Sequence, residues 1–227
     1  MDIARWAEAD NRCAGTEDAH MKIGICAIAS PLEIPYLREW FDHHHAMGVN
    51  DFILFLNDWT AFDMVEYNHM FWREMNDKTI HPVRLDGPAR QFPAYNQGTA
   101  LAEALGLDWC AFIDIDEFIK IRSDRTLESI LADYHDYPQL SLNWRLYGSS
   151  GIMDIQRDEN GKPTPDAYNV LSRFTKCERV LNRHVKQIVN IGWFRARGAT
   201  LPRFMLAHNT DSASRGLMGE MVIGPWN

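Results

Sequence analysis

The residues of this chain that are best suited to chemistry form one acidic motif, FIDIDEF, at positions 112–118. It places Asp114, Asp116 and Glu117 together, directly after an apolar run. Carboxylates this close repel one another, so the pattern costs stability unless a cation or hydrogen-bond donors compensate. Because alternate side chains of an extended chain share a face, we expect Asp114 and Asp116 to address one hard cation, Mg²⁺ or Mn²⁺.

Such a cation would bridge the diphosphate of a nucleotide ligand and neutralise charge on a leaving group. The competing interpretation makes Asp114 the cap of a following helix and leaves the other two acids solvated. An Asp-x-Asp pattern often arises by chance, so its place in the fold must decide between the two interpretations.

Strand and helix patterns alternate along the chain before the motif. Compact apolar runs predict strands at 22–30, 52–56, 79–85 and 109–113, and helical spacing predicts helices at 34–47, 62–75 and 93–105. This order predicts an α/β fold with a Rossmann-like, mostly parallel sheet flanked by helices. Open sheets of this kind bind ligands at the carboxyl ends of their strands, where the acidic motif lies. Its position therefore favours a functional role.

Polar residues near two other predicted strands are further candidates. Asn57 and Asp58 end the second strand and are candidates for holding a base or ribose, with a plain turn as the alternative. Trp144 and Arg145 precede a Gly-Ser-Ser-Gly run that starts at Gly148. A stacking face, a fixed charge and backbone amides suit a sugar or a phosphate oxygen, and the alternative is a glycine-rich hairpin with a packed tryptophan.

Composition narrows the classes of partner. The 227 residues are 46% hydrophobic, enough to bury a sizeable core, and the formal net charge of −8 opposes nucleic-acid binding. No apolar window approaches the roughly 20 residues of a transmembrane helix, so we expect a soluble, cytoplasmic protein, with contact at the inner face of the membrane left open. The four cysteines are too dispersed for a zinc or dithiol site.

The run His43–His45 also fails as a zinc site, because consecutive helical residues point in different directions. We expect at most one of these three side chains to pack inward.

The motifs, taken in order over roughly 21–208, resemble bacterial glycosyltransferases of the family 2 type, in the branch with an Asp-x-Asp-Glu-Phe motif. They resemble family 92 glycosyltransferases more distantly. The matching pieces are YLREWF at 36–41, His44, Gly48-Val49, FLND at 55–58, Tyr95-Asn96, DIDEF at 114–118, WRLYGSSG at 144–151, Val185-Lys186 and His208.

The resemblance implies a GT-A-type nucleotide-diphospho-sugar transferase fold, a UDP- or GDP-sugar donor, a divalent metal, and inverting displacement at the anomeric carbon. It further implies that Glu33 contacts the nucleoside and that His208 is a third metal ligand. For Glu33 the alternative is a helix N-terminal acid favoured by the helix dipole, and a lone histidine such as His208 is more often structural.

Two further roles follow from the chemistry that the resemblance implies. Lys186 is a candidate for offsetting diphosphate charge, although a lysine in a mixed strand is more often solvated. The acceptor hydroxyl must lose a proton as it attacks, so a carboxylate beyond the glycine-rich turn is the expected general base. Asp154 is the first choice, followed by Asp166 and Asp211.

The expected organisation is an N-terminal tail or short helix at 1–20 and a single GT-A-like domain at 21–227. Within the domain, 21–120 forms the half that binds the nucleotide-sugar. The acceptor-side half, 121–227, contains a predicted helix at 126–134, a strand at 140–146 and a polar loop at 157–167.

The predicted function is metal-dependent transfer of a sugar to a glycan or glycolipid acceptor, and the resemblance suggests surface polysaccharide or lipopolysaccharide synthesis. The main alternative is a catalytically silent nucleotide-sugar-binding protein of the same fold. It is favoured by the Ser30-Pro31-Leu32 loop, which departs from the family's usual basic residue and asparagine, and by the early end of the chain. A metal-dependent phosphohydrolase would normally need more ligands for its two-metal site.

Overall fold

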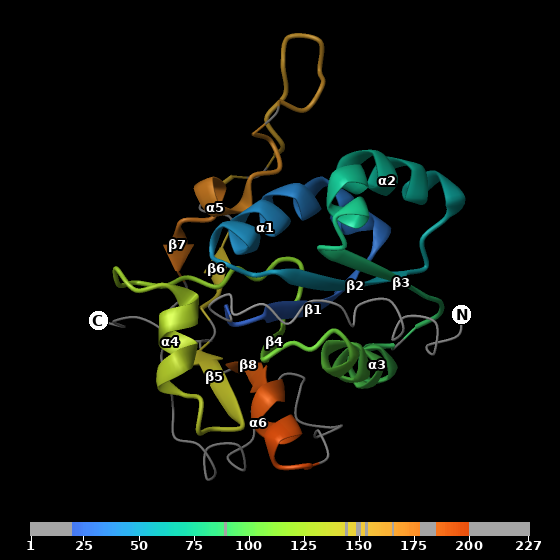
Figure 1. The fold of residues 1–227 in the computed structure, drawn as a ribbon. Helices are drawn as coiled ribbons and strands as arrows, with labels where there is room; N and C mark the ends of the chain where they lie inside the picture. The colour runs from blue at the N-terminus through green and yellow to red at the C-terminus, as the bar shows by residue number, and fades with distance from the viewer. Residues whose placement is uncertain are drawn as a thin grey trace.

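The core of the fold is a six-stranded mixed sheet (Figure 1). In this computed structural model the described residues are 20–88, 90–143, 145–148, 151–152, 154–164, 166–177 and 185–199. The strands lie in the order β3-β2-β1-β4-β8-β5. Their bounds are β1 (Ile23–Ala29), β2 (Asp51–Asn57), β3 (Ile80–Leu85), β4 (Trp109–Phe112), β5 (Gln139–Asn143) and β8 (Val185–Asn190).

The first four strands pair in parallel, β1 with β2 and β4, and β2 with β3. Strand β8 then pairs antiparallel with both β4 and β5. The four predicted strands and their parallel arrangement are therefore confirmed. The sequence pattern had not indicated that β8, a late segment, inserts between β4 and β5.

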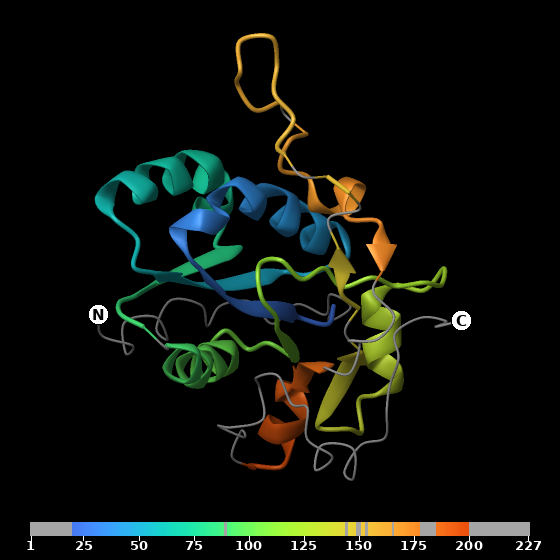
Figure 2. The ribbon, with the colours of Figure 1, turned by 180° about the vertical axis from the view of Figure 1, so that it is seen from behind.

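Helices cover both faces of the sheet (Figures 1 and 2). One side carries α1 (Ile34–Ala46) and α2 (Ala61–Asn76), and the other carries α3 (Gln91–Ala104) and α6 (Ile191–Ala196). A short 3₁₀ turn, η2 (Pro31–Glu33), precedes α1, while α4 (Leu127–Asp133) packs near β5. The helices predicted from spacing are confirmed to within a few residues, because each has a regular apolar stripe to bury against a strand.

The sheet separates two apolar clusters, since alternate residues of each strand point to opposite faces. Ile25 of β1 belongs to the cluster under α1 and α2, whereas Cys26 belongs to the cluster under α3. Helix α3 lies close to the sheet at Gly98, where an added Cβ would come within 2.4 Å of the Cys26 sulfur. Glycine at this position allows the helix backbone to approach β1.

A second, two-stranded antiparallel sheet joins β6 (Tyr147–Gly148) to β7 (Lys176–Cys177). The chain between these strands contains α5 (Val170–Arg173) and a loop, closed by a bridge between Arg157 and Pro163, that projects away from the body (Figure 1). The predicted polar loop at 157–167 is thus confirmed. The predicted strand at 140–146 is too long, since β5 ends at Asn143.

Among the helices of the described residues, none combines the length and the apolar character needed to cross a bilayer.

Candidate active site

The acidic motif lies at the carboxyl end of β4, as the sequence predicts. The expectation that it continues as extended chain is wrong, because β4 ends at Phe112 and the next residues form a turn. In this turn the Glu117 amide donates to the Asp114 carbonyl at 3.1 Å, and the Asp114 amide donates to the Glu117 carboxylate at 2.9 Å. Side-chain alternation therefore does not determine where Asp114 and Asp116 point.

Lys186 provides the positive charge that opposes two of the three acids. Its ammonium lies 2.8 Å from Oδ2 of Asp114 and 3.1 Å from Oε2 of Glu117, and its side chain is only 4% exposed. Tyr95 of α3 also donates a hydrogen bond to Asp114 Oδ1, at 3.3 Å. The negative charge of the acidic motif is thus balanced by a lysine on β8 and by a hydrogen bond from a tyrosine on α3.

Glu117 differs from the two aspartates in its burial. Its side chain is 9% exposed, and one of its oxygens, Oε1, is buried with no hydrogen-bond partner among the described residues. Burial raises the pKa of Glu117 to about 7, although the Lys186 charge opposes the shift and the Asp114 charge adds to it. Near neutral pH a large fraction of this carboxyl is therefore protonated, whereas an ordinary glutamate would be almost fully ionised.

Helix α1 holds the turn in place from the opposite side. The Trp40 indole donates to the Glu117 carbonyl at 2.9 Å, and Nε2 of His44 accepts from the Ile119 amide at 3.1 Å. Burial lowers the pKa of His44 to about 3, so this ring stays neutral and able to accept. Of the three consecutive histidines only His44 is buried, which confirms that at most one packs inward.

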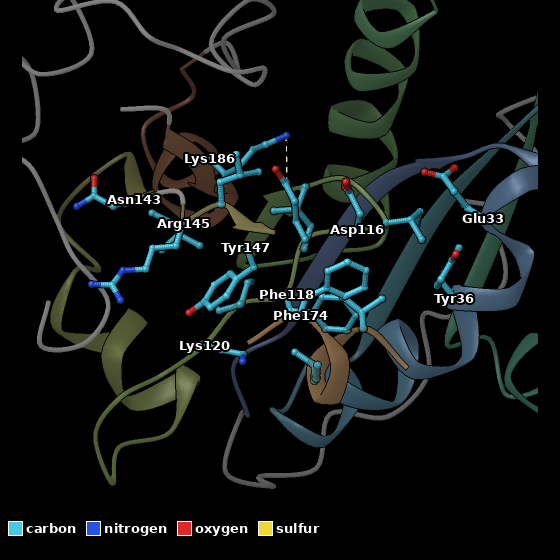
Figure 3. A pocket seen from close by; sticks show the side chains of 18 of the residues that line it. Glu33, Tyr36, Asp116, Phe118, Lys120, Asn143, Arg145, Tyr147, Phe174 and Lys186 are labelled. Atoms are coloured by element: carbon cyan, nitrogen blue, oxygen red, sulfur yellow. Dashed lines mark ion pairs between the residues drawn. The ribbon is translucent and has the colours of Figure 1, made fainter. Parts of the chain in front are cut away.

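A cavity of about 550 Å³ opens beside the motif (Figure 3). Asp116 and Glu33 lie at one side of it, and Lys120, Tyr147 and Arg145 lie at the other. Its lining also includes Glu117, Lys186 and residues of α5, together with Leu32, Tyr36, Phe118, Arg122, Leu142, Asn143, Leu146 and Phe174. The cavity extends from the acidic motif over the β5, β6 and α5 side of the molecule.

Glu33 is an acid at a helix N-terminus that also lines the cavity, and its predicted contact with a nucleoside stays a prediction. Its carboxylate accepts from the Ser30 amide at 2.6 Å, as an acid at a helix N-terminus does, and it also lines the cavity. Burial raises the pKa of Glu33; hydrogen bonds from Ser30 oppose the shift, and the charges of Asp116 and Asp114 add to it. Glu33 and the two aspartates are therefore close enough for their charges to repel one another.

A carboxylate on α1 fixes the α5 wall of the cavity. The two oxygens of Glu39 accept from the amides of Val170 and Leu171, at 2.5 and 3.1 Å. One turn earlier on α1, Tyr36 meets Tyr168 edge to face, with ring centroids 5.7 Å apart. Through these contacts the α5 segment is attached to the helix that also holds the acidic turn.

Other predicted site residues lie outside this cavity. The side-chain amide of Asn57 donates to the Asp58 carboxylate at 3.1 Å, and this carboxylate also accepts from the backbone amide of Gly87 at 2.7 Å. Both side chains therefore stabilise the loop after β2. Gly148 belongs to β6 and Asp154 to the following segment, and neither lines the cavity. The roles predicted for these four residues stay predictions.

Several predicted residues cannot be placed. Trp144, His208 and Asp211 lie outside the described residues. Asp166 is described, and its carboxylate accepts from the Asn169 side chain at 3.0 Å.

Sequence reasoning assigned no role to Glu117, Tyr95 or Glu39. All three belong to motifs that the resemblance identified, Glu117 to DIDEF, Tyr95 to Tyr95-Asn96 and Glu39 to YLREWF. The contacts of Glu39 could still not be inferred from the sequence, since its partners are backbone amides 131 and 132 residues away.

The sheet order and the acidic turn after β4 place the chain in the GT-A class of nucleotide-diphospho-sugar transferase folds. The structure of the mannosyltransferase PcManGT from Pyrobaculum calidifontis, in complex with GDP-Man and Mn²⁺, has a TM-score of 0.50 and 14% identity to this chain. The match covers 98% of this chain, which spans 59% of the mannosyltransferase. The sequence model of glycosyltransferase family 92 matches residues 29–191, most of the chain. The chain belongs to glycosyltransferase family 92.

Two other solved structures are similar at lower scores. The mannosyltransferase Ktr4p from S. cerevisiae, in complex with GDP, has a TM-score of 0.38 and 8% identity, covering 83% of this chain and 62% of that one. The galactosyltransferase LgtC, in complex with donor and acceptor sugar analogues, has a TM-score of 0.43 and 13% identity, covering 88% and 72%. No curated protein is similar enough in sequence to match this chain.

Proposed function

We propose that this chain transfers a sugar from a UDP- or GDP-sugar to an acceptor hydroxyl, with inversion and with a divalent metal. The observation that carries the proposal is the place of Asp116, an exposed carboxylate at the carboxyl end of β4 that lines a cavity also reached by Lys186. Membership of family 92 and the GT-A fold support the transfer reaction. The similar mannosyltransferase that binds GDP-Man and Mn²⁺ supports the choice of donor and metal.

The donor set fits Mg²⁺ or Mn²⁺ of the kind that bridges phosphates. No group of three metal-ligating side chains occurs in the described part of the chain. Mg²⁺, however, is commonly held by one or two carboxylates, with water and substrate phosphate completing the shell. Asp116 and Asp114 would provide these carboxylates, and the bound metal would neutralise charge on the leaving diphosphate. His208 stays a predicted third ligand outside the described residues.

The chain's own residues supply the remaining electrostatics. Lys186 is buried, held in place by two carboxylates and part of the cavity wall, so its ammonium would lie near the diphosphate without reorganisation. Glu33 would meet the nucleoside from the end of β1. Asn57, Asp58, Trp144, Arg145 and Gly148 are proposed to complete the contacts with the nucleotide-sugar.

Asp154 is proposed as the general base. Its carbonyl accepts from the Arg173 guanidinium at 3.0 Å, which ties it to α5, a wall of the cavity. Asp154→Asn should keep nucleotide affinity and lose transfer, because it removes the proton acceptor and little else. Unchanged transfer by this variant would remove Asp154 from the mechanism. We further propose a glycan or glycolipid acceptor, a role in surface polysaccharide or lipopolysaccharide synthesis, and a cytoplasmic location.

The test is calorimetric titration of UDP and GDP into the protein, with and without Mn²⁺. We expect one nucleotide to bind only with metal, and Asp116→Asn to abolish the metal-dependent part. Asp124→Asn is the matched control, since Asp124 is an exposed acid outside the cavity lining. Equal binding with and without metal would refute the metal site, and the absence of all nucleotide binding would refute the donor site.

Hydrolysis of the matching nucleotide-sugar in the same buffer separates the two functional classes. An active transferase is expected to release the sugar slowly to water, whereas a silent binding protein of this fold binds the nucleotide without turnover.

A further inference from the structure

The cavity has a polarised lining. All the carboxylates among its described lining residues, Glu33, Asp116 and Glu117, belong to the acidic motif or to the turn after β1. The opposite side carries cations, with Lys120 and Arg145 placed around Tyr147 (Figure 3). Arg122 lines the cavity as well. A cationic wall is unexpected from composition, because the chain as a whole has a formal charge of −8.

We infer that this cationic wall binds an anionic group, a carboxylate or a phosphate, on the sugar acceptor. The inference rests on the proposed function, which places the donor diphosphate at Asp116 and Lys186. The acceptor must then approach from the remainder of the cavity, over β5, β6 and α5. That remainder is the side that carries Lys120 and Arg122, with Arg145, which the proposed function assigns to the nucleotide-sugar, beside them.

The wall also has the apolar surface that a sugar ring requires. Lys120 Nζ lies 5.7 Å from the centroid of the Tyr147 ring, so the ring holds the ammonium at the cavity. Phe118 and Phe174 contribute further aromatic surface. Aromatic faces pack against the C–H face of a sugar, while arginine guanidinium groups bind carboxylates and phosphates through paired hydrogen bonds. An anionic sugar matches both features, and a neutral sugar matches only the first.

A competing explanation assigns the same cations to the donor diphosphate. The two explanations differ in what removal of the cations changes. If the wall serves the acceptor, the double variant Lys120→Ser with Arg122→Ser keeps nucleotide affinity and loses preference for anionic acceptors. If it serves the donor, nucleotide affinity falls in parallel.

The experiment measures binding to an array of glycans printed as matched sets, with the same backbone carrying a neutral sugar, its uronic acid, or its phosphomonoester. The protein is incubated with Mn²⁺ and saturating UDP or GDP, so that the donor site is occupied. We expect wild-type protein to prefer one anionic member at least about tenfold over its neutral counterpart, as a hydrogen bond to a charged group provides. Which anionic member is preferred distinguishes the carboxylate from the phosphate.

The double variant should lose that preference, and Lys162→Ser, an exposed lysine outside the cavity, should keep it. Equal binding of neutral and anionic members, binding of none, or an unchanged preference in the double variant overturns the inference. Calorimetric nucleotide affinity of the same proteins is measured separately. If the wild-type protein binds no nucleotide, the proposed function is refuted, whereas the array result refers only to the cationic wall.

Discussion

The charge balance around Lys186 gives the sharpest test of the structure. Lys186→Met keeps most of the buried stem and removes the ammonium that lies 2.8 Å from Asp114 and 3.1 Å from Glu117. At an effective dielectric constant of about 20, each pair at these distances contributes roughly 5 to 6 kcal/mol before desolvation is subtracted. The penalty of burying the ions offsets much of this, and Asp114, one-third exposed, is screened by solvent.

The expected loss of unfolding free energy is therefore about 3 to 5 kcal/mol at pH 8, the range typical of breaking a buried ion pair. The loss should shrink at acid pH. Without Lys186, protonation of Glu117 removes the uncompensated buried charge. Each pH unit below the pKa of Glu117 then reduces the loss of unfolding free energy by up to about 1.4 kcal/mol. Adding Glu117→Gln to Lys186→Met should recover at least about 1 kcal/mol at pH 8, because the amide carries no charge to bury.

Urea unfolding at pH 6 and pH 8, followed by tryptophan fluorescence, measures these differences. Lys22→Met, at an exposed lysine, is the control and should change stability by less than about 0.5 kcal/mol. A loss below about 1 kcal/mol for Lys186→Met at pH 8, or a loss identical at both pH values, would refute this account of the ion cluster.

Three further predictions test other parts of the structure. Because burial raises the pKa of Glu117 from 4.5 to about 7, the folded state holds an extra proton in this window and its stability falls as pH rises through it. Glu117→Gln should remove this fall in unfolding free energy, which amounts to about 3 kcal/mol at most between pH 4.5 and 7.5. A pH profile of stability unchanged by the substitution would contradict the raised pKa of Glu117. Gly98→Ala should lower the unfolding free energy by about 1 to 3 kcal/mol, since the new Cβ would lie 2.4 Å from the Cys26 sulfur. Unaltered stability would show that α3 does not pack against β1 as closely as the structure has it. Glu39→Ala should detach α5 from α1 and therefore speed proteolysis within 154–177, while nucleotide affinity stays constant. The control Glu103→Ala, at an exposed acid, should leave the cleavage rate unchanged. Equal cleavage rates for the two variants would contradict the anchoring role of Glu39.

The first half of the fold could be predicted because its signals are local. Strands β1 and β2 are continuous apolar runs buried on both faces, and α1 and α2 carry regular apolar stripes. The same local order placed the acidic motif at the carboxyl end of β4. Nothing beyond neighbouring residues was needed for these predictions.

The electrostatics of the site could not be predicted in the same way. Lys186 reaches Asp114 from 72 residues away, through a strand whose antiparallel insertion follows from tertiary pairing and not from its own pattern. The assumption of extended chain after Phe112 failed because the Glu117 side chain caps the Asp114 amide and closes a turn. Pairing partners and turn hydrogen bonds of this kind are properties of the folded chain as a whole.

The late position of β8 has a consequence for how this protein is made. A ribosome adds about 5 to 20 residues per second, so β4 and the acidic motif leave it several seconds before β8 does. During that interval β4 is an open edge and the carboxylates lack their lysine. The strand β8 pairs with β4 and also carries the lysine that neutralises the acidic motif, so closure of the sheet and charge balance at the acidic turn depend on the same late step of biosynthesis.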